Sequence, residues 1–151
     1  MDDLLHHEYA VGLPEDWQDK TEVVLSGPMK DGSCPTLTVT RIKLKMEQTL
    51  EQFAAYQLHG LGVQMQVKKT DVIDEGETTF GGLPAFFRIY NLRFFDKPLV
   101  QRQTYVLRGL MAYVVTETST VDQFANDRAT FNEMLKRFQF RTPVPGGATQ
   151  A

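Results

Sequence analysis

The alternation of hydrophobic and polar positions is most regular between residues 84 and 120, where it predicts three long antiparallel strands. These runs are rich in Phe, Tyr, Val, Leu and Thr, which suit a half-buried pleated surface. Turn signals at 94–98 and at Arg108-Gly109 separate them. Because side chains alternate between faces, Gln101, Gln103 and Tyr105 share one face of the second strand. Both faces are partly apolar, so each needs cover.

Shorter strands are predicted before this meander, at residues 10–13, 21–25 and 36–45. Pro14 ends the first strand, and Trp17 is expected to anchor the turn that follows on the core.

The side chains of the two later strands can be assigned to the two faces of the predicted sheet. Glu22 and Val24 share one face of the strand at 21–25. In the strand at 36–45, Leu37 and Val39 occupy one phase, whereas Ile42 and Leu44 occupy the other. Such a change predicts either a bulge or a strand that passes between two environments.

A helical period begins near Glu47. The apolar positions recur at three- and four-residue spacing: Leu50, Phe53, Ala54, Leu58 and Leu61. Thr49 and Gln52 fit a capping box, and Gly60 with Gly62 is expected to end the helix. Gln57 lies inside the apolar stripe, where a buried amide either bonds a neighbouring carbonyl or serves a function.

The remaining segments complete the predicted fold. Residues 63–79 are expected to form two edge strands with a turn at Asp74-Glu75-Gly76. A second amphipathic helix is marked by Phe124, Phe131, Met134, Leu135 and Phe138. Residues 143–151 carry no periodicity, which predicts a disordered tail after a single domain over 1–142.

Composition narrows the classes of function. The chain has 151 residues and a formal net charge of -3 without a basic cluster, which argues against nucleic acid as a partner. Cys34 is the single cysteine, so no intramolecular disulfide is expected. The N-terminal sequence lacks the pattern of a secretory signal, and no apolar run approaches transmembrane length. We therefore expect a cytoplasmic protein without direct membrane insertion.

The sequence does not assemble a catalytic or metal site. His6 and His7 are adjacent and would point to opposite faces of a strand, and His59 is distant in sequence, so surface histidines are favoured over a metal centre. No serine lies in a nucleophile-elbow pattern, and no glycine pair opens a helix after a strand. These patterns predict a protein that is not an enzyme and needs no cofactor.

The predicted fold is therefore α+β: a curved, mainly antiparallel sheet with two helices packed on one face. The other face would carry Val24, Thr38, Gln101, Gln103 and Tyr105, an apolar surface interleaved with polar groups. Exposed apolar patches larger than roughly 400 Å² usually mark a partner site. The alternatives are that a homodimer closes this face, or that it is ordinary core.

Several stretches together resemble the Eag chaperones of bacterial type VI secretion, which have a PsbP-like fold. These stretches are LPEDWQD before a short strand, LEQFAAYQL in the first helix, QRQTYVLRGLMAYVVTETST in the meander and FNEMLKRFQF at the end. Their order and spacing cover nearly the whole chain up to Pro143.

The resemblance implies a cytoplasmic homodimer that binds the hydrophobic N-terminal transmembrane segments of a PAAR-containing, often Rhs-type, effector until the effector is loaded on the VgrG spike. It places client-binding positions at Glu22, Val24, Thr38, Gln57, Gln103 and Tyr105, to which the alternation adds Gln101. Glu22 and Thr38 depart from the apolar character that the family favours there. The alternative function is a non-catalytic adaptor or assembly subunit that docks on a folded partner.

Overall fold

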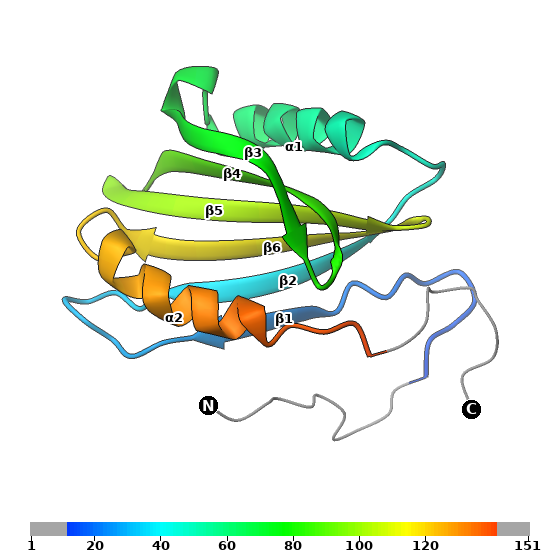
Figure 1. Cartoon of the computed structure of the whole chain (residues 1–151), viewed down its shortest axis with the longest axis horizontal. Helices are drawn as coiled ribbons and strands as arrows, with labels where there is room; N and C mark the ends of the chain where they lie inside the picture. The colour runs from blue at the N-terminus through cyan, green and yellow to red at the C-terminus, as the bar shows by residue number, and fades with distance from the viewer. Residues whose placement is uncertain (1–11, 142–151) are drawn as a thin grey trace.

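The computed structural model describes residues 12–141, which form a six-stranded antiparallel sheet and two α-helices. The strands are β1 (Glu22–Ser26), β2 (Thr36–Lys43), β3 (Val72–Phe80), β4 (Leu83–Phe94), β5 (Lys97–Arg108) and β6 (Met111–Thr120), and the helices are α1 (Leu50–Met65) and α2 (Phe124–Lys136). Their order across the sheet is β1-β2-β6-β5-β4-β3, and the sheet is curved (Figure 1). The α+β class and the antiparallel sheet are confirmed.

The two helices lie on opposite faces of the sheet, so the expectation that both cover one face is wrong. Phe53 of α1 packs in a cluster with Tyr105 and Val114, whereas Phe131 of α2 packs with Val106 and Val115. Neighbouring residues of a strand point to opposite faces. We call these sides the α1 face and the α2 face; in Figure 1, α2 lies in front of β6 and β2.

The meander of β4, β5 and β6 forms as predicted. Phe95 and Asp96 make the first tight turn with φ of 49° and 63°, and Gly109 in the second has φ of 59°. Positive φ at both central residues gives a turn whose twist matches that of the flanking strands. The second turn sets Arg108 opposite Met111, which fixes the register of β5 on β6.

The segment before β1 differs in part from prediction. Residues 10 and 11 of the first predicted strand lie outside the described residues, and residues 12–20 contain no strand. The turn exists, because the Trp17 backbone N–H donates to the Pro14 carbonyl at 3.1 Å. The Trp17 side chain is 68% exposed, so its predicted anchoring on the core is wrong.

Helix α1 begins with the predicted capping box, in which Thr49 and Gln52 bond each other's backbone N–H groups. It does not end at Gly60 or Gly62 but continues to Met65, where Gln66 adopts a left-handed conformation with φ of 57°. At Gly62 a Cβ atom would lie 3.3 Å from the carbonyl oxygen of Val67, so the glycine admits the returning chain. The glycine marks a close approach and not a terminus.

Strand β3 replaces the two predicted edge strands. A short 3₁₀ turn, Lys69–Asp71, leads into a single strand that runs through the expected turn at 74–76. Gly76 lies opposite Phe87, whose ring would be 3.5 Å from a Cβ atom at that position. The glycine therefore makes room for an aromatic side chain, and the predicted turn is wrong.

The change of phase in β2 reflects two environments. Leu37 and Val39 contact the cluster beneath α2, whereas Ile42 contacts the cluster beneath α1. The pairing of β2 with β6 is continuous, so the second of the two predicted alternatives is confirmed. The second helix forms, but Phe138 lies just after it; the predicted disordered tail, 143–151, lies outside the described residues.

Candidate partner-binding site

The strand register gathers the sheet residues that the sequence singled out on the α1 face. Val24, Thr38, Thr116, Gln103 and Arg88 lie in one row across the strands. A neighbouring row contains Glu22 and Tyr105, and the row on the other side contains Gln101. Gln57 is half-buried on α1, the helix that covers this face. The register thus brings residues from distant parts of the chain onto one surface.

A chain of hydrogen bonds follows the row of Gln103. Arg88 Nη1 donates to the Tyr105 hydroxyl at 3.3 Å, the hydroxyl donates to Gln103 Oε1 at 2.7 Å, and Gln103 Nε2 donates to Thr116 Oγ1 at 3.3 Å. Arg88 also donates to the Ala54 carbonyl of α1 at 2.9 Å. This chain ties α1 to the middle of the sheet and fixes the orientation of the Gln103 amide.

A second chain of hydrogen bonds runs beside the first. The Tyr90 hydroxyl donates to Gln101 Oε1 at 2.6 Å, and Gln101 Nε2 donates to Thr118 Oγ1 at 3.0 Å. Burial raises the pKa of Tyr90 above its ordinary value and raises that of Tyr105 to about 12, so both hydroxyls keep their protons at neutral pH. Both glutamines are therefore held by neutral partners.

The buried residues of this face support its exposed ones from beneath. Tyr105 has no exposed surface and packs edge-on against Phe53, with ring centroids 5.8 Å apart. Its expected exposure is wrong, because α1 covers this end of the face. Gln103 is 9% exposed, whereas Val24 at the far edge is 59% exposed. Accessibility therefore increases from α1 toward β1.

The accessible part of the α1 face is a polar but uncharged strip, which we call the threonine–glutamine surface. It consists of Val24, Thr36, Thr38, Thr116, Thr118 and Gln101, with the largely buried Gln103 at its inner end, and the register places these residues side by side on β1, β2, β6 and β5. Hydroxyl and amide groups both donate and accept hydrogen bonds, and their methyl and methylene groups are apolar. Such a surface can contact an apolar chain without burying a charge.

Glu22 lies at the margin of this surface. Its side chain is exposed, and Oε1 accepts a hydrogen bond of 3.1 Å from the Thr40 hydroxyl. An exposed carboxylate at the edge of the sheet stays hydrated, so its charge is compatible with an uncharged surface beside it.

Sequence reasoning missed three residues that organise the site: Arg88, Thr116 and Thr118. Arg88 is only 3% exposed, and besides the bonds described above its Nε donates to Glu75 Oε2 at 2.9 Å. The threonines accept the amide hydrogens of Gln103 and Gln101. Counting back from the two-residue turn at Gly109 pairs each glutamine with its threonine, so the sequence held that signal.

The described residues contain neither a candidate metal centre nor a helix that could span a membrane. They contain no group of three or more His, Cys, Asp or Glu side chains that could hold a metal ion. His6 and His7 lie outside the described residues. Within residues 12–141, neither helix has the length and apolar character needed to cross a bilayer.

Comparison with known proteins gives both a family and a fold. The model of the DcrB family matches residues 8–137, which is most of the chain. No curated protein matches the sequence. A solved structure of PA94, a Pseudomonas aeruginosa protein of unknown function, superposes with a TM-score of 0.76 at 18% identity, covering 90% of this chain and 94% of that one.

A second solved structure shares the fold at lower similarity. It is LpqN of Mycobacterium tuberculosis, involved in cell envelope biogenesis, with a TM-score of 0.51 at 13% identity, covering 80% of this chain and 84% of that one. Both identities are low, so these structures establish the fold alone. The family match extends over the helices, the sheet and the threonine–glutamine surface, and the chain belongs to the DcrB family.

Proposed function

We propose that this protein is a cytoplasmic effector chaperone of the Eag type, which acts without catalysis. It binds the hydrophobic N-terminal transmembrane segments of a PAAR/Rhs effector on the threonine–glutamine surface until the effector is loaded on the VgrG spike. A homodimer would present two such surfaces to one client. The observation that carries this proposal is the uncharged strip of amides and hydroxyls, held by two chains of hydrogen bonds and left uncovered by α1.

The chemistry of the strip suits an apolar helix. A transmembrane segment in water leaves apolar area exposed at a cost of about 25 cal/mol per Å². Within membranes such helices pack through small side chains and through Ser, Thr and Gln hydrogen bonds. Thr38 and Thr116 offer methyl groups beside hydroxyls, and Val24 adds an apolar contact at the edge. The strip thus supplies contacts of the kind that a neighbouring membrane helix supplies.

The test is co-expression with an effector that carries apolar N-terminal helices, followed by affinity recovery of the complex. Thr38→Asp places a charge in the middle of the strip and should weaken recovery at least about tenfold, because the charge loses water without gaining a partner. Asn91→Asp is the matched control: it adds the same charge at an exposed position of β4 on the opposite face. This control should bind normally.

Deletion of the effector's N-terminal segment separates this function from its alternative. Loss of the complex upon deletion supports binding of the transmembrane segments. Retained binding contradicts the proposal and favours an adaptor that docks on the folded part of its partner.

A further inference from the structure

A recess on the α2 face lies beside buried polar atoms that make no hydrogen bond within the fold. Among the described residues, the buried side-chain atoms without a hydrogen-bond partner are Arg102 Nε, Thr104 Oγ1 and Glu117 Oε2. All three belong to the α2 face, on the adjacent strands β5 and β6. Buried polar groups are nearly always hydrogen-bonded in folded proteins, so a cluster of exceptions calls for an explanation.

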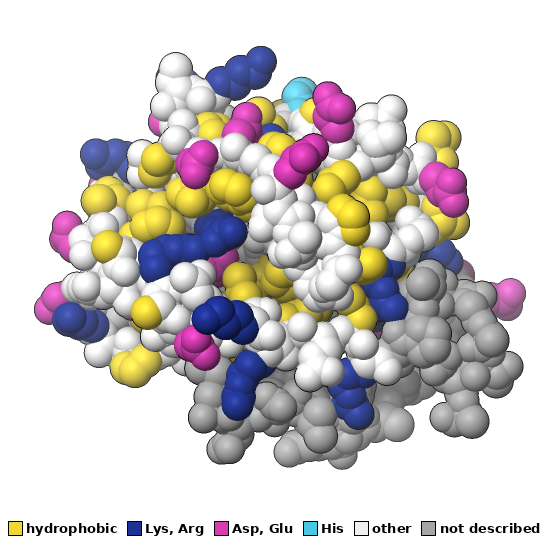
Figure 2. Space-filling model, in the orientation of Figure 1, with side chains coloured by type: hydrophobic (Ala, Val, Ile, Leu, Met, Phe, Trp, Pro, Cys, Tyr) yellow, Lys and Arg dark blue, Asp and Glu magenta, His cyan; other side chains and the backbone are white. Residues whose placement is uncertain are grey.

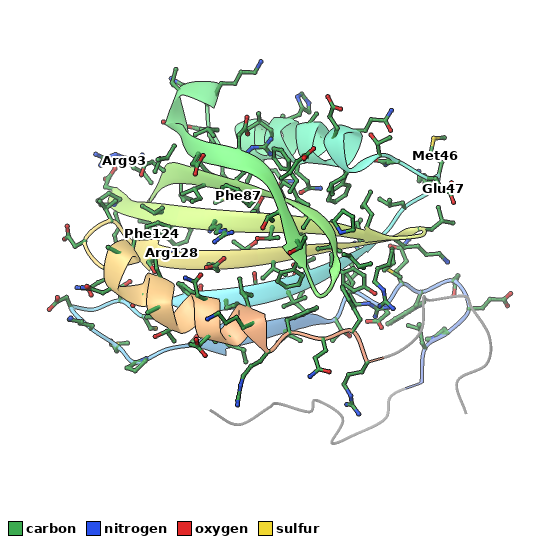
Figure 3. The ribbon with its side chains drawn as sticks, in the orientation of Figure 1. Met46, Glu47, Phe87, Arg93, Phe124 and Arg128 are labelled. Carbon is green, nitrogen blue, oxygen red and sulfur yellow. The ribbon has the colours of Figure 1, made fainter. Side chains whose placement is uncertain are left out.

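Two of these residues, Arg102 and Thr104, line a recess of about 450 Å³ between α2 and the β3–β4 turn. Figure 2 shows hydrophobic side chains in a hollow on this side of the molecule, and Figure 3 marks Arg128 on α2 and Phe87 on the sheet there. The volume lies within the range of about 300–1,000 Å³ found for small-molecule sites. Thr104 is only 2% exposed, so its hydroxyl lies at the inner end.

The lining residues determine which ligand chemistry fits. Arg102 and Lys136 are the cations of the recess, and no aspartate or glutamate lines it. Asn132 accepts a hydrogen bond from Arg128 Nη2 at 3.1 Å through its carbonyl oxygen, which leaves its amide nitrogen as a donor. Hydroxyls are present at Thr78, Thr79 and Thr104. Such a set of donors favours an anion.

The rest of the lining is apolar. Phe80 is 6% exposed, and Leu135 and Phe138 pack against the same cluster from α2 and the segment after it. The Phe80 and Phe138 rings lie with centroids 4.4 Å apart. We propose that this recess binds a small amphipathic carboxylate, with its head group at Arg102 and Thr104 and its apolar body against Phe80, Leu135 and Phe138.

This site is independent of the proposed chaperone function, because it lies on the opposite face from the threonine–glutamine surface. The carboxylate gives the Thr104 hydroxyl the partner that it lacks, and it pairs with the Arg102 guanidinium, whose Nε already lies 3.9 Å from Glu117 Oε2. Glu117 does not line the recess; it is bonded to Arg128 at 2.7 Å and lies 3.9 Å from Arg102 Nε.

The experiment titrates the protein with octanoate by calorimetry and follows the amide resonances of Gly81 and Gly82 at the rim by NMR. Octanoate should bind saturably and shift both resonances. Octanol, which has the same chain without a charge, should bind at least about tenfold more weakly, because charge-assisted hydrogen bonds are the strong ones.

Two variants and one control locate the site. Thr104→Val keeps the shape and should weaken octanoate binding by about three- to tenfold while leaving the melting temperature unchanged or higher, since the hydroxyl has no protein partner to lose. Lys136→Met should weaken binding by a smaller factor, whereas Lys45→Met, which removes an exposed cation before α1, should have no effect. The proposal would be overturned if octanoate binding did not saturate or if octanol bound as tightly as octanoate. It would also be overturned if the Thr104→Val variant bound octanoate as tightly as the wild-type protein.

Discussion

The two faces of the sheet place their polar groups in opposite ways. On the α1 face, Gln101 and Gln103 are each held between a tyrosine and a threonine by neutral hydrogen bonds. On the α2 face, Glu117 is wholly buried between Arg128 at 2.7 Å and Arg102 at 3.9 Å, and one of its oxygens has no hydrogen-bond partner. Strands β5 and β6 thus hold neutral, satisfied glutamines on one side and an ionic, incompletely satisfied cluster on the other, while the charge of the α1 face is on Arg88 of β4, which is paired with Glu75 of β3.

This difference indicates which polar groups a partner can cover at a low cost in free energy. A neutral network with its bonds already made costs little to cover with an apolar chain, whereas an ion pair costs several kcal/mol to remove from water. The ionic cluster lies under α2, where Arg128 is one of the side chains that link the helix to the sheet. The neutral network instead runs from Tyr105, beneath α1, to Thr116 on β6, and the strip continues beyond it to the exposed Val24.

The largest expected effect comes from placing a carboxylate in the buried part of the α1 face. Tyr105→Asp should unfold the isolated protein. The side chain at this position has no exposed surface, so a buried carboxylate there should lower the free energy of unfolding by about 4 kcal/mol or more. Loss of the near-ultraviolet circular dichroism signal measures this. Tyr105→Phe is the control and should remain folded. A folded Tyr105→Asp protein would show that α1 does not cover this position.

An intermediate effect is expected from the pH dependence of the ionic face. Burial raises the pKa of Glu117, with Arg128 and Arg102 opposing the shift. Between pH 4.5, the ordinary pKa of the group, and the raised pKa of the folded protein, Glu117 is protonated in the folded chain and ionised in the unfolded chain. Rising pH therefore lowers the free energy of unfolding in this range.

Comparison with Glu117→Gln, which cannot titrate, isolates this contribution. As pH falls toward 4.5, the wild-type protein should gain free energy of unfolding relative to the variant, at about 1.4 kcal/mol for each unit of the pKa shift. Chemical denaturation across this pH range measures the gain. A difference that stays constant with pH would mean that the two arginines fully offset the burial of Glu117.

The smallest expected effect tests a single link of the neutral network. Thr118→Val removes the acceptor of the Gln101 amide and should lower the free energy of unfolding by about 1 kcal/mol. Thr40→Val, whose hydroxyl bonds the exposed Glu22, should cost less because water replaces that bond. Equal costs for the two variants in denaturant titrations would argue that the network contributes no more than a surface contact.

Much of the local structure was predictable, because it depends on neighbouring residues. Alternation predicted β4, β5 and β6 and the composition of their faces, and the Thr49–Gln52 pair predicted the start of α1. The predictions at Gly62 and Gly76 were wrong because a glycine in a sequence indicates only conformational freedom. In the structure, Gly62 instead allows the close approach of Val67, and Gly76 allows that of Phe87. That need arises from a distant part of the chain.

The sequence by itself determined the class of the fold, the alternation of each strand and the presence of glutamines among apolar residues. Only the tertiary structure decided that α1 and α2 lie on opposite faces of the sheet. The apolar stripe of an amphipathic helix predicts that the helix packs on a sheet, but not on which face of the sheet it packs. It also decided that Tyr105 is core, that Arg88 joins α1 to the glutamines, and that the accessible surface lies toward β1. These outcomes depend on contacts between segments far apart in the chain, which local patterns do not encode.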